Sequence, residues 1–176
     1  MIRGVIFDLG NTLVQQVVDA QVSLAAVDMK LLPGARECLE QICRRLKVAV
    51  LSNTERTTSE ELEQVFQRLG LDALGISLFT SVSIGFRKPA PEAFMQVADA
   101  LGLAPAELVM VGNDPREDIA GAQAIGMHTV YVGRAEDLGA IVPDLVVAGV
   151  GALSGEALEA LAFGNTFQKQ CRHKEV

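Results

Sequence analysis

The sequence predicts an α/β fold, a three-layer sandwich with helices on both faces of a mainly parallel central sheet. Short runs rich in Val, Ile, Leu and Phe alternate with longer stretches whose apolar residues repeat at helical spacing. Strands that are buried on both faces form such continuous apolar runs, and helices between them are typical of parallel connections. The length of 176 residues, 49% of them hydrophobic, suits one compact core of this kind.

Six apolar runs are the predicted strands, and each is short and uncharged, as strands covered on both faces should be. They span Val5–Phe7, Val48–Leu51, Leu78–Thr80, Val109–Val111, Thr129–Val132 and Leu145–Val147. We expect a single core domain over residues 1–164 and a flexible, polar tail over residues 165–176.

Five helices are predicted, over residues 33–46, 58–70, 91–102, 115–126 and 154–163. Proline stands at the start of three of them, and glycine stands at the end of three. Thr58 and Glu61 have the spacing of a capping box. The segment 14–32 fits neither the helical nor the strand period, and we expect a hairpin or an irregular flap at the edge of the sheet.

The composition argues against several partners and compartments. A net charge of -7 disfavours binding to nucleic acid or to an anionic membrane, and no apolar run is long enough to span a bilayer. The three cysteines form no CxxC pair, which is typical of reduced thiols. The first strand reaches an acidic residue too early for a signal peptide. We therefore expect a cytoplasmic protein.

Polar residues follow four elements of the predicted sheet. In open α/β sheets, ligands bind beyond the carboxyl ends of the strands, where the strand order reverses. The residues expected there are Asp8, Gly10, Asn11, Thr12, Ser52, Asn53, Arg87, Lys88, Asn113, Asp114 and Asp118. Taken one at a time, most have a structural explanation; Asp114, for example, precedes Pro115 as an ordinary helix cap would.

Together, these residues suit a phosphoryl group held beside a hard cation. Carboxylates bind such a cation through oxygen, and a lysine with backbone N–H groups offsets the remaining phosphate charge. Carboxylates without a metal would repel a phosphate, so the electrostatics require the cation. We expect this cation to be Mg²⁺.

The ordered motifs resemble those of the haloacid dehalogenase-like superfamily of hydrolases, most of which are magnesium-dependent phosphatases with a Rossmann-like core. The resemblance covers Val5 to about Leu153. It rests on four motifs: a strand followed by Asp8 and Thr12-Leu13, a strand followed by Ser52-Asn53, Lys88-Pro89 before a helix, and Val111-Gly112-Asn113-Asp114 with Asp118, Ala122 and Gly126. Each motif is weak alone, but the ordered set is specific.

The resemblance implies a role for each matching residue. Asp8 would attack phosphorus and form an aspartyl-phosphate, Ser52 would hydrogen-bond a phosphoryl oxygen, and Lys88 would offset negative charge. Magnesium would lie between the Asp8 carboxylate, the carbonyl oxygen of Gly10 and the side chains of Asn113, Asp114 and Asp118, some of them through water. The remaining predictions concern the substrate: contacts from Asn11, Thr12, Asn53 and Arg87, and a site mouth lined by Glu55 and Arg56.

The sequence departs from the family pattern at two positions. Family phosphatases usually carry a second aspartate, the general acid and base, two residues after the nucleophile, where this chain has Gly10. Asn113 also stands where many members have aspartate. Loss of a positioned proton donor costs about 10²–10⁴-fold in rate, and least for good leaving groups such as acyl phosphates.

The chain has no room for the helical cap that many relatives insert between the first two motifs. The site should therefore be open to a phosphorylated small molecule or an accessible macromolecular phosphate. A second copy of the chain could supply the lid.

The leading hypothesis is thus a magnesium-dependent phosphohydrolase. The alternatives are a catalytically weakened module that binds a phosphate ligand or a protein, and, with less support, a haloacid dehalogenase, whose apolar pocket would need the missing cap.

Overall fold

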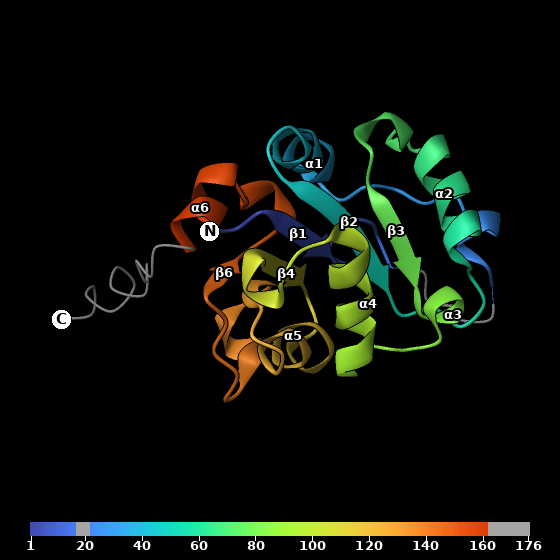
Figure 1. Ribbon diagram of the computed structural model, residues 1–176. Helices are drawn as coiled ribbons and strands as arrows, with labels where there is room; N and C mark the ends of the chain where they lie inside the picture. Colours follow the sequence, from blue (N-terminus) through green and yellow to red (C-terminus); the bar gives the residue numbers. More distant parts are fainter. Residues whose placement is uncertain (17–21, 162–176) are drawn as a thin grey trace.

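One parallel sheet of six strands runs through the centre of the computed structural model, which describes residues 1–16 and 22–161 (Figure 1). The strand order is β3-β2-β1-β4-β5-β6, and every neighbouring pair is parallel. The strands are β1 (Gly4–Phe7), β2 (Lys47–Ser52), β3 (Ser77–Thr80), β4 (Leu108–Gly112), β5 (His128–Val132) and β6 (Leu145–Val147). The predicted fold class and all six predicted strands are confirmed.

Helices cover both faces of the sheet. On one face lie α1 (Ala35–Cys43), α2 (Ser59–Arg68) and α6 (Gly155–Leu161); on the other lie α4 (Pro91–Leu101) and α5 (Gly121–Gln123), while the short α3 (Ser81–Ile84) follows β3 (Figure 1). Alternate residues of β1 face the two layers: Val5 and Phe7 belong to the core under α1 and α2, and Ile6 belongs to the core under α4. All three side chains are fully buried.

The helix ends follow the local sequence signals with one shortening. Thr58 and Glu61 form the predicted capping box, and α4 ends before Gly102, whose φ of 64° suits glycine. The first helix ends at Cys43, short of the predicted Leu46, because the N–H groups of residues 45 and 46 both bond to the carbonyl of Ile42 in a tight turn. Residues 162 and 163 of the last predicted helix lie outside the described residues.

The helix predicted over residues 115–126 is not regular. Its first part, η4 (Pro115–Ala120), is a π-helix, and the regular α5 follows it. The N–H of Ile119 bonds to the carbonyl of Asp114, five residues back, at 3.3 Å. Such wide turns are frequent at functional sites. Here the wide turn directly follows β4, and it contains Asp118, which is buried next to the end of that strand.

The segment 14–32 begins at the central strand β1 rather than at an outer strand. Val14 forms an antiparallel bridge with Leu31, so that residues 13–15 and 30–32 run as a short hairpin-like pair. The 3₁₀ turn η1 (Leu24–Ala26) then packs against α2, and the Leu24 N–H donates to Thr57 Oγ1 at 2.9 Å. The described parts of the segment, residues 14–16 and 22–32, therefore lie beside the carboxyl ends of β1 and β2.

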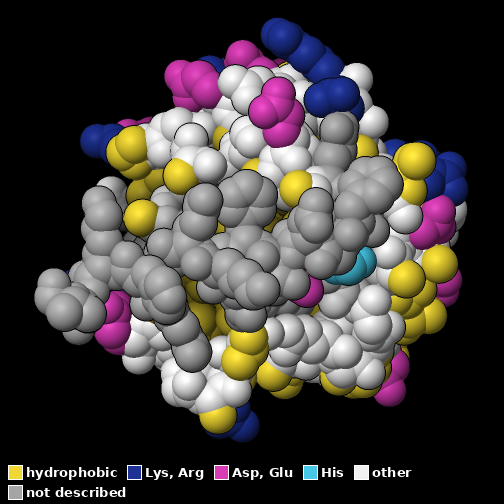
Figure 2. Space-filling view, turned by 90° about the vertical axis from the view of Figure 1, so that its left-hand side faces the viewer, with side chains coloured by type: hydrophobic (Ala, Val, Ile, Leu, Met, Phe, Trp, Pro, Cys, Tyr) yellow, Lys and Arg dark blue, Asp and Glu magenta, His cyan; other side chains and the backbone are white. Residues whose placement is uncertain are grey.

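The sheet ends at β6, where Val146 is partly exposed. On the side of the molecule next to this strand, hydrophobic side chains lie among charged ones of both signs (Figure 2).

None of the helices in the described part of the chain is long and apolar enough to cross a membrane. The predicted tail, residues 165–176, lies outside the described residues.

Candidate active site

A cavity of about 380 Å³ opens at the carboxyl ends of β1, β2 and β4, where the strand order reverses. It opens to solvent, since Glu55, Arg87 and Asp114 at its rim are exposed. The structure thus brings the predicted site residues to one place. The polar groups lining the cavity are Asp8, Gly10, Gln16, Ser52, Asn53, Thr54, Glu55, Thr57, Arg87, Asn113, Asp114, Glu117 and Asp118.

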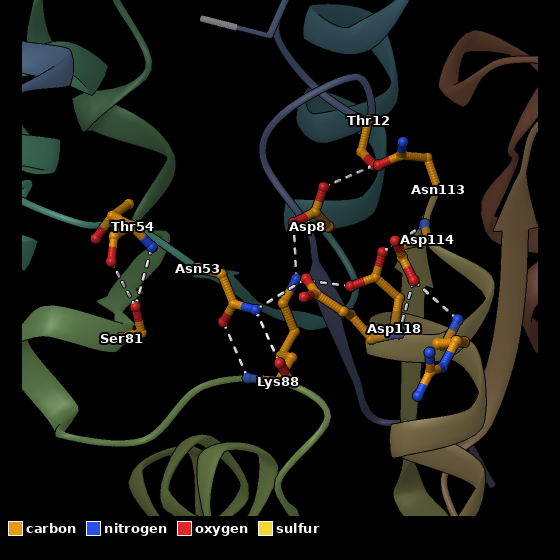
Figure 3. Close-up of polar contacts among 11 residues, drawn as sticks. Asp8, Thr12, Asn53, Thr54, Ser81, Lys88, Asn113, Asp114 and Asp118 are labelled. Atoms are coloured by element: carbon orange, nitrogen blue, oxygen red, sulfur yellow. Dashed lines mark hydrogen bonds and ion pairs between the residues drawn. The ribbon is translucent and has the colours of Figure 1, made fainter. Parts of the chain in front are cut away.

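Lys88 forms the charged centre beneath this cavity (Figure 3). Its Nζ donates to Asp8 Oδ1 at 2.7 Å and to Asp118 Oδ1 at 2.6 Å. The side chains of Lys88 and Asp118 are each 1% exposed, whereas that of Asp8 is 13% exposed and reaches the cavity. Two carboxylates therefore share one buried ammonium group, and one of them, Asp8, also faces the cavity.

The surroundings of Lys88 keep it protonated. Burial alone would lower the pKa of its ammonium group, but the charges of Asp8 and Asp118 and their hydrogen bonds outweigh burial and hold the pKa above its usual value. Burial raises the pKa of the Asp118 carboxyl, against the opposing effect of Lys88. A permanent positive charge thus lies against Asp8 Oδ1.

Asn53 holds Lys88 in position. Its Oδ1 accepts from the Lys88 N–H, and its Nδ2 donates to the Lys88 carbonyl oxygen and to Glu117 Oε2, each at 2.9 Å. Asn53 borders the cavity, but its amide is already occupied by these partners. In this structure the Asn53 side chain positions Lys88, and its contact with substrate stays a prediction.

Thr12 lies under Asp8 and is fully buried. Its Oγ1 donates to Asp8 Oδ2 at 3.1 Å and lies 3.2 Å from Asn113 Oδ1. The predicted substrate contact of Thr12 is wrong, because a side chain with no exposed surface cannot reach a ligand. Thr12 instead orients the carboxylate of Asp8.

Three oxygen atoms converge on the other side of the Asp8 carboxylate. Asn113 Oδ1 lies 2.9 Å from the carbonyl oxygen of Gly10 and 3.2 Å from Asp8 Oδ2, with no proton between them. Rotating the amide would instead let its nitrogen donate to both. A carboxylate, a backbone carbonyl and an amide oxygen form a donor set that suits a hard cation such as Mg²⁺.

The two remaining acids of the predicted metal site face other partners. Asp114 Oδ1 accepts from the N–H groups of Arg116 and Glu117 at 2.8 and 2.7 Å, which caps η4. Asp118 Oδ2 accepts from the Asp114 N–H at 2.9 Å. Within residues 1–16 and 22–161, no three His, Cys, Asp or Glu side chains cluster as a metal site. The candidate site thus uses one carboxylate, one amide and one backbone carbonyl.

Comparison with known proteins identifies the family. The model of the haloacid dehalogenase-like hydrolases matches residues 17–126, more than half of the chain. This chain belongs to the haloacid dehalogenase-like hydrolase family.

Several proteins of known sequence or structure are similar to it. The chain is 36% identical over 119 residues to a ribulose-1,5-bisphosphate 5-phosphatase of Halopiger xanaduensis, covering 68% of this chain and 49% of the relative. It is 35% identical over 118 residues to the haloacid dehalogenase-like hydrolase domain-containing protein 3 of Mus musculus, covering 66% of this chain and 45% of that protein. The chain thus spans about half the length of these relatives.

A solved structure has nearly the same extent. It is an uncharacterized protein from Listeria monocytogenes serotype 4b, which matches with a TM-score of 0.80 and 28% sequence identity. The match covers 91% of this chain and 98% of the other.

Asn11 and Gln16 both lie next to Gly10, but of the two only Gln16 lines the cavity. Asn11 has a left-handed φ of 56°, a conformation that asparagine tolerates better than most residues. Its side chain pairs with Gln16 and does not line the cavity. The predicted substrate contact of Asn11 is therefore corrected, and Gln16 takes its place at the cavity.

The rim contains the remaining predicted residues. Ser52, at the end of β2, lines the cavity and is 6% exposed. Arg87 and Glu55 also line it and form an ion pair of 2.8 Å, with both side chains half exposed. Arg56 is exposed and does not line the cavity.

Several cavity residues were not assigned to the site from the sequence, among them Glu117 and four residues of the segment 14–32. Glu117 lies one position before a predicted metal ligand, and its acidic character in a first helical turn has an ordinary explanation. Gln16, Val22, Leu24 and Met29 belong to the segment 14–32, whose sequence has no clear period. A polar residue in that segment offered no signal, because its position depends on the hairpin-like pair formed with residues 30–32.

Proposed function

We propose that this chain is a magnesium-dependent phosphohydrolase that transfers a phosphoryl group to Asp8. The observation that carries the proposal is the contrast between the two oxygens of Asp8. Oδ1 lies against Lys88 at 2.7 Å, and Oδ2 lies 3.2 Å from the side-chain amide of Asn113. One carboxylate is thus arranged to meet a cation through one oxygen and a phosphoryl group through the other. The similarity to a ribulose-1,5-bisphosphate 5-phosphatase supports phosphate chemistry.

Each residue of the site has a separate role in the proposed reaction. Asp8 Oδ1 attacks phosphorus, and Lys88 offsets the charge of the attacking carboxylate and of the phosphoryl oxygens. The Ser52 hydroxyl at the rim donates to a phosphoryl oxygen. Thr12 holds Asp8 in place from below, and Asn53 holds Lys88.

Asp8, the Gly10 carbonyl and Asn113 would hold the magnesium ion directly, and Asp114 and Asp118 would contribute through water. When bound, it supplies positive charge at the phosphoryl group. The need for this charge follows from the lining: among the described residues of the cavity, five are acidic and one, Arg87, is basic. A phosphate dianion would be repelled from such a cavity without a cation.

The substrate is a phosphomonoester or an acyl phosphate whose phosphate projects far enough to enter an open cavity. The exposed rim residues Glu55, Arg87 and Asp114 leave room for a large substrate, or for a second copy of the chain that serves as a lid.

The test is a phosphatase screen of the purified chain with acetyl phosphate, sugar phosphates and nucleotides, with Mg²⁺ and with EDTA. We expect phosphate release that needs Mg²⁺ and that Asp8→Asn lowers by at least about 10³-fold, because an amide is a poor nucleophile. Asp137→Asn is the matched control, since Asp137 does not line this cavity.

Two other outcomes would overturn the proposal. Binding of phosphate without turnover of any substrate would make the chain a binding module. Chloride release from a haloacid without Mg²⁺ would make it a dehalogenase.

A further inference from the structure

The space next to Gly10 contains the side chain of Gln16. A Cβ atom built on Gly10 would lie 3.6 Å from Gln16 Cγ and 3.8 Å from Gln16 Cβ. Any side chain at position 10 would therefore extend toward Gln16. Gln16 also lines the cavity that contains Asp8. The aliphatic part of the Gln16 side chain thus lies next to the position where a side chain at residue 10 would begin, at the wall of the cavity.

The orientation of the Gln16 amide follows from its contacts with Asn11. The backbone N–H of Gln16 donates to Asn11 Oδ1 at 3.3 Å, so the other end of the Asn11 amide must be its NH₂ group. That group donates to Gln16 Oε1 at 2.6 Å. The oxygen of Gln16 is therefore occupied by Asn11, and its Nε2 remains the end that can donate to a ligand.

We propose that Gln16 is a catalytic residue that donates a hydrogen bond to the leaving-group oxygen, and that the enzyme therefore acts on phosphates with good leaving groups. This inference rests on the proposed phosphohydrolase function. An amide donates a hydrogen bond but transfers no proton at neutral pH. The leaving group must then depart as an anion that needs little stabilisation, as a carboxylate, an enolate or a phenolate does.

Neither of the two displacement steps needs a general acid from the protein. In the first step Asp8 Oδ1 forms a bond to phosphorus, and the bond from phosphorus to the leaving oxygen breaks. The leaving group takes the electron pair, held by the N–H of Gln16, and an alcohol-type product later takes its proton from solvent. In the second step water attacks phosphorus, the bond from phosphorus to Asp8 breaks, and the released proton passes to phosphate or solvent.

The carboxylates that line the cavity are engaged elsewhere. Glu55 pairs with Arg87, and Asp118 pairs with Lys88. Asp114 caps η4 through two N–H groups. Glu117 accepts from Asn53 on the Lys88 side of the cavity. Of these four, Glu117 has a neutral side-chain partner, so it is the rival donor that the experiment must test.

The experiment measures kcat/KM for a series of substituted phenyl phosphates and for alkyl phosphates, at several pH values and saturating Mg²⁺. For the native chain we expect the rate to fall steeply as the leaving-group pKa rises. Gln16→Ala should lower kcat/KM by about 10²-fold, as loss of one positioned donor does. Gln15→Ala is the matched control, because Gln15 is exposed and does not line the cavity.

Gln16→Glu separates hydrogen bonding from proton transfer. The introduced carboxyl should raise turnover of alkyl phosphates as the pH falls and it becomes protonated, and so flatten the leaving-group dependence. A merely structural role of Gln16 would change neither the slope nor the pH profile.

The outcomes distinguish this inference from the proposed function. If no phosphate is turned over with Mg²⁺, the proposed function itself fails. If turnover is found but its rate does not depend on the leaving group, or if Glu117→Gln changes that dependence and Gln16→Ala does not, the role of Gln16 is overturned while the phosphatase stands.

Discussion

The two sides of Asp8 are built in opposite ways. On the inner side, Lys88 and Asp118 are buried, and their ion pair is 2.6 Å long. On the outer side, Gly10 is partly buried, and Asn11 and Gln16 are exposed and carry no charge. In the proposed reaction, the inner side holds the Asp8 nucleophile and its charge, whereas the outer side contacts the leaving group.

The difference predicts how substitutions on each side affect stability and turnover. A buried charge centre tolerates little change, because each charge depends on its partners for compensation. The outer side holds no ionisable group at residues 10, 11 or 16, so it can vary without unfolding the protein. We therefore expect substitutions on the inner side to change stability and turnover together, and substitutions on the outer side to change turnover or specificity alone.

The largest effect on stability is expected from Lys88→Met. Removing the ammonium group leaves the carboxylates of Asp8 and Asp118 facing each other, with Asp118 buried. We expect a loss of about 3–5 kcal/mol in the free energy of unfolding, measured by urea denaturation. Lys30→Met, at an exposed lysine, should change it by less than about 0.5 kcal/mol. An equal free energy of unfolding for the two variants would show that the buried ion pairs do not contribute to stability.

A pair of glycine substitutions compares the two sides directly. A Cβ atom on Gly112 would lie 2.2 Å from Asp118 Oδ2, whereas one on Gly10 meets its nearest neighbour at 3.6 Å, an ordinary contact. Gly112→Ala must displace Asp118, and we expect it to cost about 1–3 kcal/mol. Gly10→Ala should stay within about 0.5 kcal/mol. Thermal or urea unfolding measures both, and the reverse order would contradict the comparison.

The smallest effect is expected at the rim. Arg87→Ala breaks a half-exposed ion pair with Glu55, and such pairs contribute less than about 1 kcal/mol to stability. If Arg87 attracts the substrate phosphate, KM should rise several-fold while kcat stays the same. Arg134→Ala, at an exposed arginine that does not line the cavity, is the kinetic control. A fall in kcat without a change in KM would place Arg87 in the chemical step instead.

The inner side of the site could be predicted from the sequence, and the outer side could not. Asp8 and Asp118 follow strands with uninterrupted apolar runs, and parallel strands end at one edge, so the pattern alone predicts that they meet. Thr12 belongs to the predicted motif, but its side chain is buried against Asp8 and does not line the cavity. The sequence does not show which side of a loop is enclosed. Gln16 could not be found, since its place depends on pairing between residues far apart in an aperiodic segment.

The π-helical geometry of η4 also could not be predicted from the sequence, because it depends on tertiary contacts. A proline, an acidic cap and apolar spacing predict a helix from residue 115, and a helix does begin there. The sequence pattern does not distinguish a bond over five residues from one over four. That choice depends on tertiary contacts, which include the bonds from Asp118 to Lys88 and to the Asp114 N–H.

The side chain of Asn113 determines how much charge repulsion the pocket contains when no cation is bound. A carboxylate at that position would face Asp8 Oδ2 at 3.2 Å and would repel it whenever the cation left. An amide carries no charge and can rotate, presenting oxygen to a cation or nitrogen to the Gly10 carbonyl and Asp8. An amide at residue 113 therefore removes one source of repulsion from a pocket that holds no cation.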